Sequence, residues 1–337
     1  MRSAFLLQAP VNDGIQVPIG YWVAFFALIS VLLFLDLFLH RKVTRISARK
    51  AIAWVAFWVS LAVIFNIWVG VRFGQKTALE FTTGYLIEEA LSVDNLFVFI
   101  VIFRYFKVKP EYQHRILFWG ILGAVVFRLL FVLAGTELIK RFHAVVYFFG
   151  LLLIYSGWKL LVQRDVEVDP DRNWAVRLFR RYVPTTAEFE GPRFLVRRDG
   201  KLVATPLLLV LLVVETTDVV FAVDSVPAVL AITKDAFIVF TSNVFAILGL
   251  RSLYFVLAGM MEAFRYLKAG LSLVLVFVGL KMLLSDAIEI PIYVSLGVVA
   301  SILATSVVLS LVIPRPLPRP PASPADAPPL PPTSDEG

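Results

Sequence analysis

The 337 residues contain no cysteine, only three histidines and only four methionines. The absence of cysteine excludes disulfide bonds, thiolate metal sites and thiol catalysis within these residues. Because none of the three histidines lies in the middle of an apolar segment, a copper or zinc site built from soft ligands is not expected. The apolar segments also lack a His-Glu-x-x-His pattern and a Ser-His-Asp grouping, so we expect no enzyme activity.

Charged residues are also scarce, at 17% of the chain against roughly 25% in soluble proteins. Hydrophobic residues make up 59%, and the mean hydropathy is +0.82, which indicates a polytopic membrane protein. The net charge of +7 comes from basic residues in the loops between apolar segments. Such residues are typical orientation signals, so we expect the lipid bilayer as a partner, together with other membrane proteins, and no nucleic acid.

Nine apolar runs are each long enough to cross about 30 Å of hydrocarbon, which predicts an all-α membrane protein. The first run has no small-residue cleavage site, so we interpret it as a spanning helix and not as a signal peptide. The predicted spans are 18–39, 51–70, 79–103, 116–138, 143–162, 206–231, 236–259, 269–286 and 291–313.

Basic loops alternate along the chain with loops that carry few basic residues. The positive-inside rule therefore places residues 1–17 outside the cytoplasm and the C-terminus inside it. The transmembrane domain is predicted over 18–313. The long loop 163–205 is then cytoplasmic, with a small hairpin turning at Asp199 and Gly200. The Pro-rich tail 314–337 is predicted to be disordered.

Three marks recur in the same order in two parts of the chain. "EEALSVDN" (88–95) matches "DVVFAVDS" (218–225), "FVLAG" occurs at 131–135 and 255–259, and Gly-x-Lys occurs at 157–159 and 279–281. They predict a repeat of three helices, with spans 3–5 (79–162) matching spans 6–8 (206–286). Because three is odd, the second unit enters the membrane in the opposite sense, as in many secondary transporters that bind substrate where the repeats meet.

The acidic residues in these segments are costly unless they avoid lipid. An Asp at a helix centre costs roughly 2.5–3.5 kcal/mol on insertion scales, so the acids must face the bundle interior, a water-filled cavity or each other. Glu88, Ser92 and Asn95 share one helix face, whereas Asp94 lies about 120° away. Pro227 predicts a kink or break in span 6, beside Asp224.

The candidate ligands all carry side-chain oxygen atoms, which suit hard divalent cations such as Mg²⁺, Ca²⁺ and Mn²⁺. They are Glu88, Asp94, Asn95, Glu215, Asp218, Asp224 and Ser225, with Asp36, Thr217 and Asn243 as further candidates.

An alternative is that buried acids are neutralised internally. Arg128 in span 4 and Arg251 in span 7 are candidate charge partners in a purely structural ion pair. This alternative applies most to Glu89, which lies on another face from Glu88 and has Val219 opposite it in the second repeat.

Three segments carry a resemblance to a known family: "ALEFTTGYLIEEALSVDNLFVF" (78–99), "EYQHRILFWGILGA" (111–124) and the segment from Val213 to Phe255. The chain resembles the TerC/Alx family of integral membrane proteins from about residue 18 to 312. The resemblance implies a bacterial inner-membrane protein of the cation-exporter group that includes lysine exporters. The family is historically labelled as conferring tellurium resistance, and its members are linked to manganese export or to supplying metal to exported proteins.

The residues predict a transporter of a hard divalent cation, and the resemblance narrows that cation to Mn²⁺. We expect a Mn²⁺ exporter that works by alternating access, with protons as the coupling ion and no resident cofactor. The alternatives are a transporter of Ca²⁺ or another cation, a metal-delivery partner of the secretion machinery, and a non-transporting stress or tellurium-resistance factor acting through loop 163–205.

Overall fold

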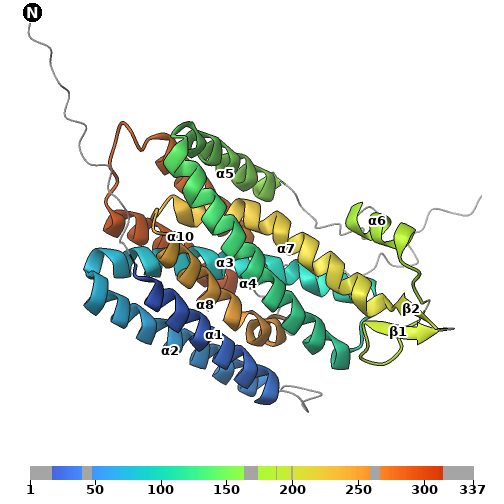
Figure 1. Cartoon of the computed structure of the whole chain (residues 1–337). Coiled ribbons are helices and arrows are strands. Elements are labelled where there is room, and N and C mark those ends of the chain that lie inside the picture. Colours follow the sequence, from blue (N-terminus) through green and yellow to red (C-terminus); the bar gives the residue numbers. More distant parts are fainter. Residues whose placement is uncertain are drawn as a thin grey trace, which may run out of the picture.

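A computed structural model describes residues 17–39, 48–162, 174–186, 188–198, 200–258 and 266–313. These residues form ten helices and one two-stranded sheet (Figure 1). The helices are α1 (Ile19–Leu39), α2 (Ala48–Phe73), α3 (Gln75–Tyr105), α4 (Pro110–Arg141), α5 (Ala144–Val162), α6 (Trp174–Tyr182), α7 (Pro206–Leu230), α8 (Ala236–Leu257), α9 (Leu267–Leu283) and α10 (Ile292–Val312), and the strands are β1 (Leu195–Arg198) and β2 (Lys201–Ala204).

A helix occupies each of the nine ranges in which the sequence predicts a span. The predicted bounds of the third and fourth spans are too short, because α3 and α4 continue through polar residues at both ends. Six helices, α2, α4, α5, α7, α8 and α10, are long and apolar enough to cross a membrane. The crossing of α1, α3 and α9 stays a prediction. Their apolar stretches are shorter or, in α3, interrupted by charges.

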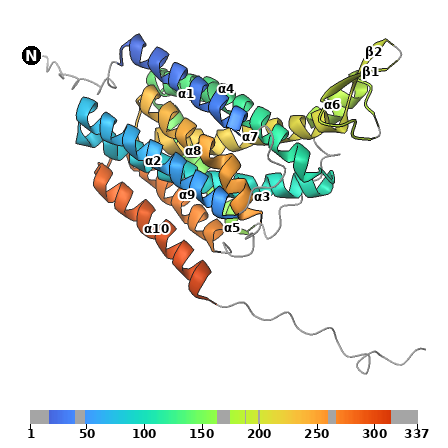
Figure 2. The same cartoon turned by 90° about the horizontal axis from the view of Figure 1, so that it is seen from below.

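The long loop contains more structure than the sequence predicts. The predicted hairpin is confirmed, since β1 and β2 pair antiparallel with Arg198 opposite Lys201, although Asp199 itself lies outside the described residues. The amphipathic helix α6 was not predicted. In Figure 2 the hairpin and α6 stand out from one end of the helix bundle, where β2 leads directly into α7.

Helix α8 lies at the centre of the bundle and packs against α2, α3 and α4. Its 22 residues have apolar side chains on all sides, which is the pattern of a helix enclosed by others. Aromatic rings fill the contact with the neighbouring helices, and Phe65 of α2 lies 4.8 Å from Phe245 between ring centroids. α8 therefore packs directly against α3 and α4, the helices that carry Glu88 and Arg128.

Close helix contacts reveal the relative directions of the elements. On α4, Gly120 lies beside Val214 and Gly135 lies beside Leu230, so α4 and α7 run in the same direction. On α5, Gly150 contacts Gly279 whereas Gly157 contacts Ser272, so α5 and α9 run in opposite directions. The Ser272 hydroxyl also donates a 2.5 Å hydrogen bond to the carbonyl oxygen of Gly157.

The α5–α9 crossing makes one glycine replacement destabilising. A Cβ atom at Gly279 would lie 2.7 Å from the Gly150 carbonyl oxygen, so we expect Gly279→Ala to lower the free energy of unfolding by about 1–3 kcal/mol. Gly297→Ala in α10 is the matched control, because a Cβ atom there meets nothing within 4 Å. Thermal unfolding in detergent would measure both, and equal stability of the two variants would contradict the crossing.

Pro227 was predicted to kink or break α7, and the prediction of a break is wrong. The helix continues from Pro206 through Pro227 and ends at Leu230. Because Pro227 lies in the last turn, its missing amide affects little of the helix, and the Ala231 amide resumes hydrogen bonding by donating to the Pro227 carbonyl oxygen.

Candidate functional site

Glu88 of α3 and Asp218 of α7 are both buried inside the bundle. Their shared partner is Arg128 of α4, whose side chain is also fully buried. Arg128 Nη1 donates to Glu88 Oε1, and Arg128 Nη2 lies 4.0 Å from Asp218 Oδ1. An ion pair so deep in the bundle requires partners for every charge, since a buried charge without one is very costly.

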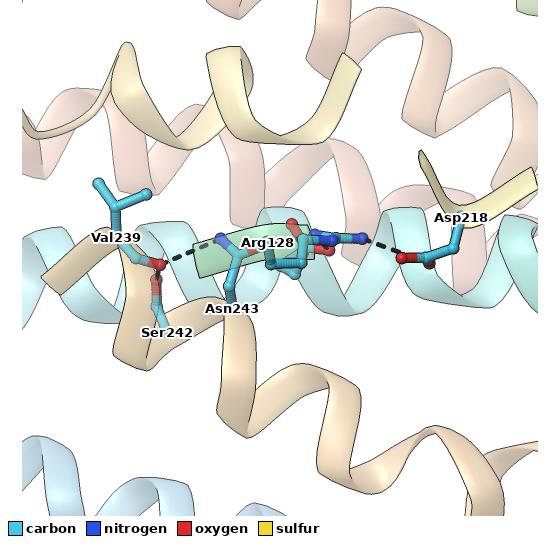
Figure 3. Close-up of polar contacts among 6 residues, drawn as sticks. Arg128, Asp218, Val239, Ser242 and Asn243 are labelled. Carbon is cyan, nitrogen blue, oxygen red and sulfur yellow. Dashed lines mark hydrogen bonds and ion pairs between the residues drawn. The ribbon is translucent and has the colours of Figure 1, made fainter. Parts of the chain in front are cut away.

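Asn243 of α8 completes this arrangement, which we call the Arg128 cluster: Glu88, Arg128, Asp218 and Asn243. Its side-chain oxygen accepts a 2.5 Å hydrogen bond from Arg128 Nη1. Its amide nitrogen donates to the Val239 carbonyl oxygen at 3.1 Å, which orients the oxygen toward Arg128. Figure 3 shows Arg128 lying between Asp218 and Asn243. Four different helices therefore meet at one guanidinium group.

The cluster contains more carboxylate than cationic charge. A further acid lies within electrostatic reach, Glu215 beside Asp218. Gly123 of α4 makes room for Glu215, because any Cβ atom there would collide with its carboxylate oxygens. A low-dielectric site with several carboxylates and one guanidinium has the charge character that attracts a cation.

Several buried polar atoms around the cluster have no hydrogen-bond partner among the described residues. They are Asp218 Oδ2, Ser92 Oγ, Asn95 Nδ2 and Glu215 Oε2. Such atoms are rare in folded proteins and call for an explanation such as a ligand or water. The predicted face of α3 is confirmed as interior, because Glu88, Ser92 and Asn95 are all buried.

Asp94 and Asp224 have other partners than the Arg128 cluster. Asp94 lies near Lys268 of α9. Asp224 accepts a 2.6 Å hydrogen bond from Ser156 of α5 and lies near Lys159. Their separation from Glu88 agrees with the angular offset predicted on a regular helix. Asp94 therefore lies near α9, whereas Asp224 lies near α5.

Thr217, Arg251 and Asp36 are the remaining candidates. The Thr217 hydroxyl donates to the Val213 carbonyl oxygen at 2.6 Å, and Arg251 is buried in α8 two turns beyond Asn243. The side chain of Asp36 lies outside the described residues. No group of three or more His, Cys, Asp or Glu side chains among the described residues is arranged to hold a metal ion. Arg128 instead occupies the space between the two acids.

Sequence reasoning missed Ser156 and Lys268 as partners of the two aspartates. A serine or a lysine near the end of an apolar span carries no distinguishing pattern of its own. No sequence signal could have found them, because both contacts depend on how α5 packs against α7 and how α9 packs against α3.

The fold and the cluster define a class: a multi-pass helical membrane protein with a charged site buried at its centre. The chain belongs to the integral membrane protein TerC family, whose model matches residues 73–316. It is 50% identical to the "Uncharacterized membrane protein STKORF319" of Myxococcus xanthus, over 83% of this chain and 88% of that protein.

Two further relatives carry a functional name. The protein called "Putative membrane-bound redox modulator Alx" is 46% identical in Photorhabdus laumondii, over 83% of this chain and 91% of the relative. The Escherichia coli K12 protein of the same name is 44% identical, over 82% and 90%. No solved structure matches this chain.

Proposed function

We propose that this protein exports a hard divalent cation, most simply Mn²⁺, across the bacterial inner membrane by alternating access. The observation that carries the proposal is the convergence of Glu88 and Asp218 from equivalent positions of α3 and α7. Carboxylate, amide and hydroxyl oxygens surround that point, and such ligands suit Mn²⁺. In this proposal Arg128 occupies the site in the absence of metal and must withdraw when the cation enters.

The packing supports two inverted repeats, α3–α5 and α7–α9, within a chain that crosses the membrane nine times. α3 precedes α4 across a short turn and runs against it, as the Glu88–Arg128 contact requires. Because α4 and α7 run in the same direction, α3 and α7 run in opposite directions. Exchanging the two halves maps the Gly150–Gly279 contact onto the contact between Ser272 and Gly157. Such pseudo-symmetry is the architecture of many alternating-access transporters.

In this proposal the N-terminus lies outside the cell and the C-terminus lies in the cytoplasm. Export of a dication then requires a coupling ion. Moving a dication out of a cell against about 100 mV costs about 4.6 kcal/mol. Surplus carboxylates at the site allow protons to occupy it after the metal leaves. Proton exchange is therefore the coupling that we propose.

Flux in proteoliposomes tests the cation class. We expect the wild-type protein to carry Mn²⁺ well above protein-free vesicles, Ca²⁺ more slowly, and Zn²⁺ near background, because no soft ligands are present in the cluster. The matched control is the same protein with Glu88→Gln. Absence of flux for all three ions, with the protein folded, would contradict transport.

The name of the Alx relatives suggests a second candidate, a role in redox modulation of the membrane. With no cysteine in these residues, such a role would act indirectly, for example through the supply of metal to exported proteins. A non-transporting factor acting through loop 163–205 is the remaining alternative. If this alternative held, deleting that loop would abolish the phenotype even though the acidic residues of the helices remain in place.

A further inference from the structure

A cavity of about 770 Å³ opens at the end of the bundle where α7 and α9 end and α3 and α10 begin. This end is opposite to the hairpin, because β2 joins the other end of α7 (Figure 1). A smaller cavity of about 170 Å³ adjoins it and shares Lys281 and Ser285. In the topology proposed above, this end faces the outside of the cell.

The inner wall of the large cavity carries a half-buried carboxylate, that of Glu80 in α3. It faces the Thr233 hydroxyl and lies near the ammonium groups of Lys76 in α3 and Lys281 in α9. Asp235 lies nearby, but its side chain accepts hydrogen bonds from the Phe237 and Ile238 amides and caps α8. Glu80 is therefore the inner carboxylate that remains free of backbone capping.

Glu80 and Glu88 lie on the same face of α3, with Gly84 between them. A spacing of four residues places successive side chains on one face, and eight residues span roughly 12 Å along the axis. Glu80 thus lies two helical turns from the Arg128 cluster, in the direction of the cavity.

The path between the two carboxylates is closed at Gly84. A Cβ atom there would lie 2.9 Å from both Ser242 Oγ and a methyl group of Val229. Ser242 precedes Asn243, which accepts from Arg128, so this constriction touches the cluster directly. Side chains of α7 and α8 thus pack against Gly84 between the levels of the two carboxylates.

We propose that this cavity is the outer release vestibule for a divalent cation, with Glu80 as the carboxylate that receives the cation from the buried site. The inference rests on the proposed function and adds the exit route. A release site must hold its ion weakly, and the ammonium of Lys281 beside Glu80 repels a cation and lowers its affinity. Opening requires the side chains packed against Gly84 to separate from it, which moves α3 relative to α7 and α8.

The absence of cysteine from the chain permits a direct test. Ser285→Cys places one thiol in the vestibule, where Ser285 is exposed. In intact cells we expect a membrane-impermeant maleimide to label it and MnCl₂ in the medium to slow the labelling. Adding Glu80→Gln is expected to raise the half-protecting Mn²⁺ concentration by about tenfold, and adding Lys281→Gln to lower it by a similar factor.

Glu289→Gln is the matched control, because Glu289 is an exposed carboxylate of the same cavity. It should leave protection within about twofold of the parent. Maleimide labelling of each variant in the absence of Mn²⁺ is the control that the variant folds and reaches the membrane. Two results would contradict the vestibule even if the protein transports Mn²⁺. One is labelling of the thiol only after the cells are opened, and the other is a half-protecting Mn²⁺ concentration that Glu80→Gln leaves unchanged. If protection depends on Glu80 but the protein shows no Mn²⁺ flux, the proposed function is contradicted. The cavity is then a cation-binding site and not an exit route.

Discussion

Replacing Arg128 with methionine is expected to destabilise the protein by about 3–5 kcal/mol, because Glu88 and Asp218 then lose their shared buried cation. Methionine keeps an unbranched side chain in the space between α3, α4 and α7, so most of the effect comes from the charge. Asn243 loses its donor as well. Thermal unfolding of the purified protein in detergent measures the loss.

A double-mutant cycle separates charge from packing. Adding Glu88→Gln to Arg128→Met removes one of the two stranded carboxylates, so we expect the double variant to be more stable than Arg128→Met alone. Arg141→Met is the control for removing an arginine, since Arg141 pairs with Glu137 on the surface of α4 and such exposed pairs contribute little. Equal unfolding temperatures for Arg128→Met and Arg141→Met would show that the cluster does not hold the bundle together.

Loss of either acid of the cluster is expected to abolish metal export. Glu88→Gln and Asp218→Asn each keep the shape of the side chain and remove one anionic ligand, which we expect to reduce Mn²⁺ efflux at least about tenfold. Cells loaded with Mn²⁺ and expressing these variants should retain it, as elemental analysis of the cells would show.

Neighbouring acids supply the controls for that experiment. Glu89→Gln should export normally, because Glu89 faces Tyr85 and lies off the Glu88 face. Asp94→Ala and Asp224→Ala should reduce export, since each aspartate joins its helix to α9 or α5, which must move during alternating access. Wild-type export by Glu88→Gln at normal protein levels would exclude the cluster as the site.

The sequence predicted the helical architecture and the burial of Glu88 and Asp218, because both depend on local pattern. Apolar runs near 20 residues indicate spanning helices, and acids within such runs must avoid lipid. Span ends were less accurate, as helical hydrogen bonding in α4 begins at Pro110, well before the apolar run. The break at Pro227 failed because proline disturbs only the turn before it, and α7 ends there.

The composition of the site was only partly predictable. Arg128 was expected as one of two charge partners, but only tertiary packing places its guanidinium between two acids that are 130 residues apart in the chain. Asp94 and Asp224 share the acidic motif with Glu88 and Asp218, yet they face other helices. Glu80 escaped notice because a charged residue near the end of a span is ordinary. The shared helix face of Glu80 and Glu88 indicates a function only once the structure shows the cavity next to Glu80.

Equilibrium binding of Mn²⁺ to the purified protein, followed by the paramagnetic signal of the free ion, tests the central claim most directly. The wild-type protein is expected to bind Mn²⁺ with a stoichiometry near one per chain. The folded double variant Glu88→Gln/Asp218→Asn should bind none at that site, while Glu89→Gln should bind like the wild type. Unchanged stoichiometric binding by the double variant would contradict the assignment of Glu88 and Asp218 as the cation site.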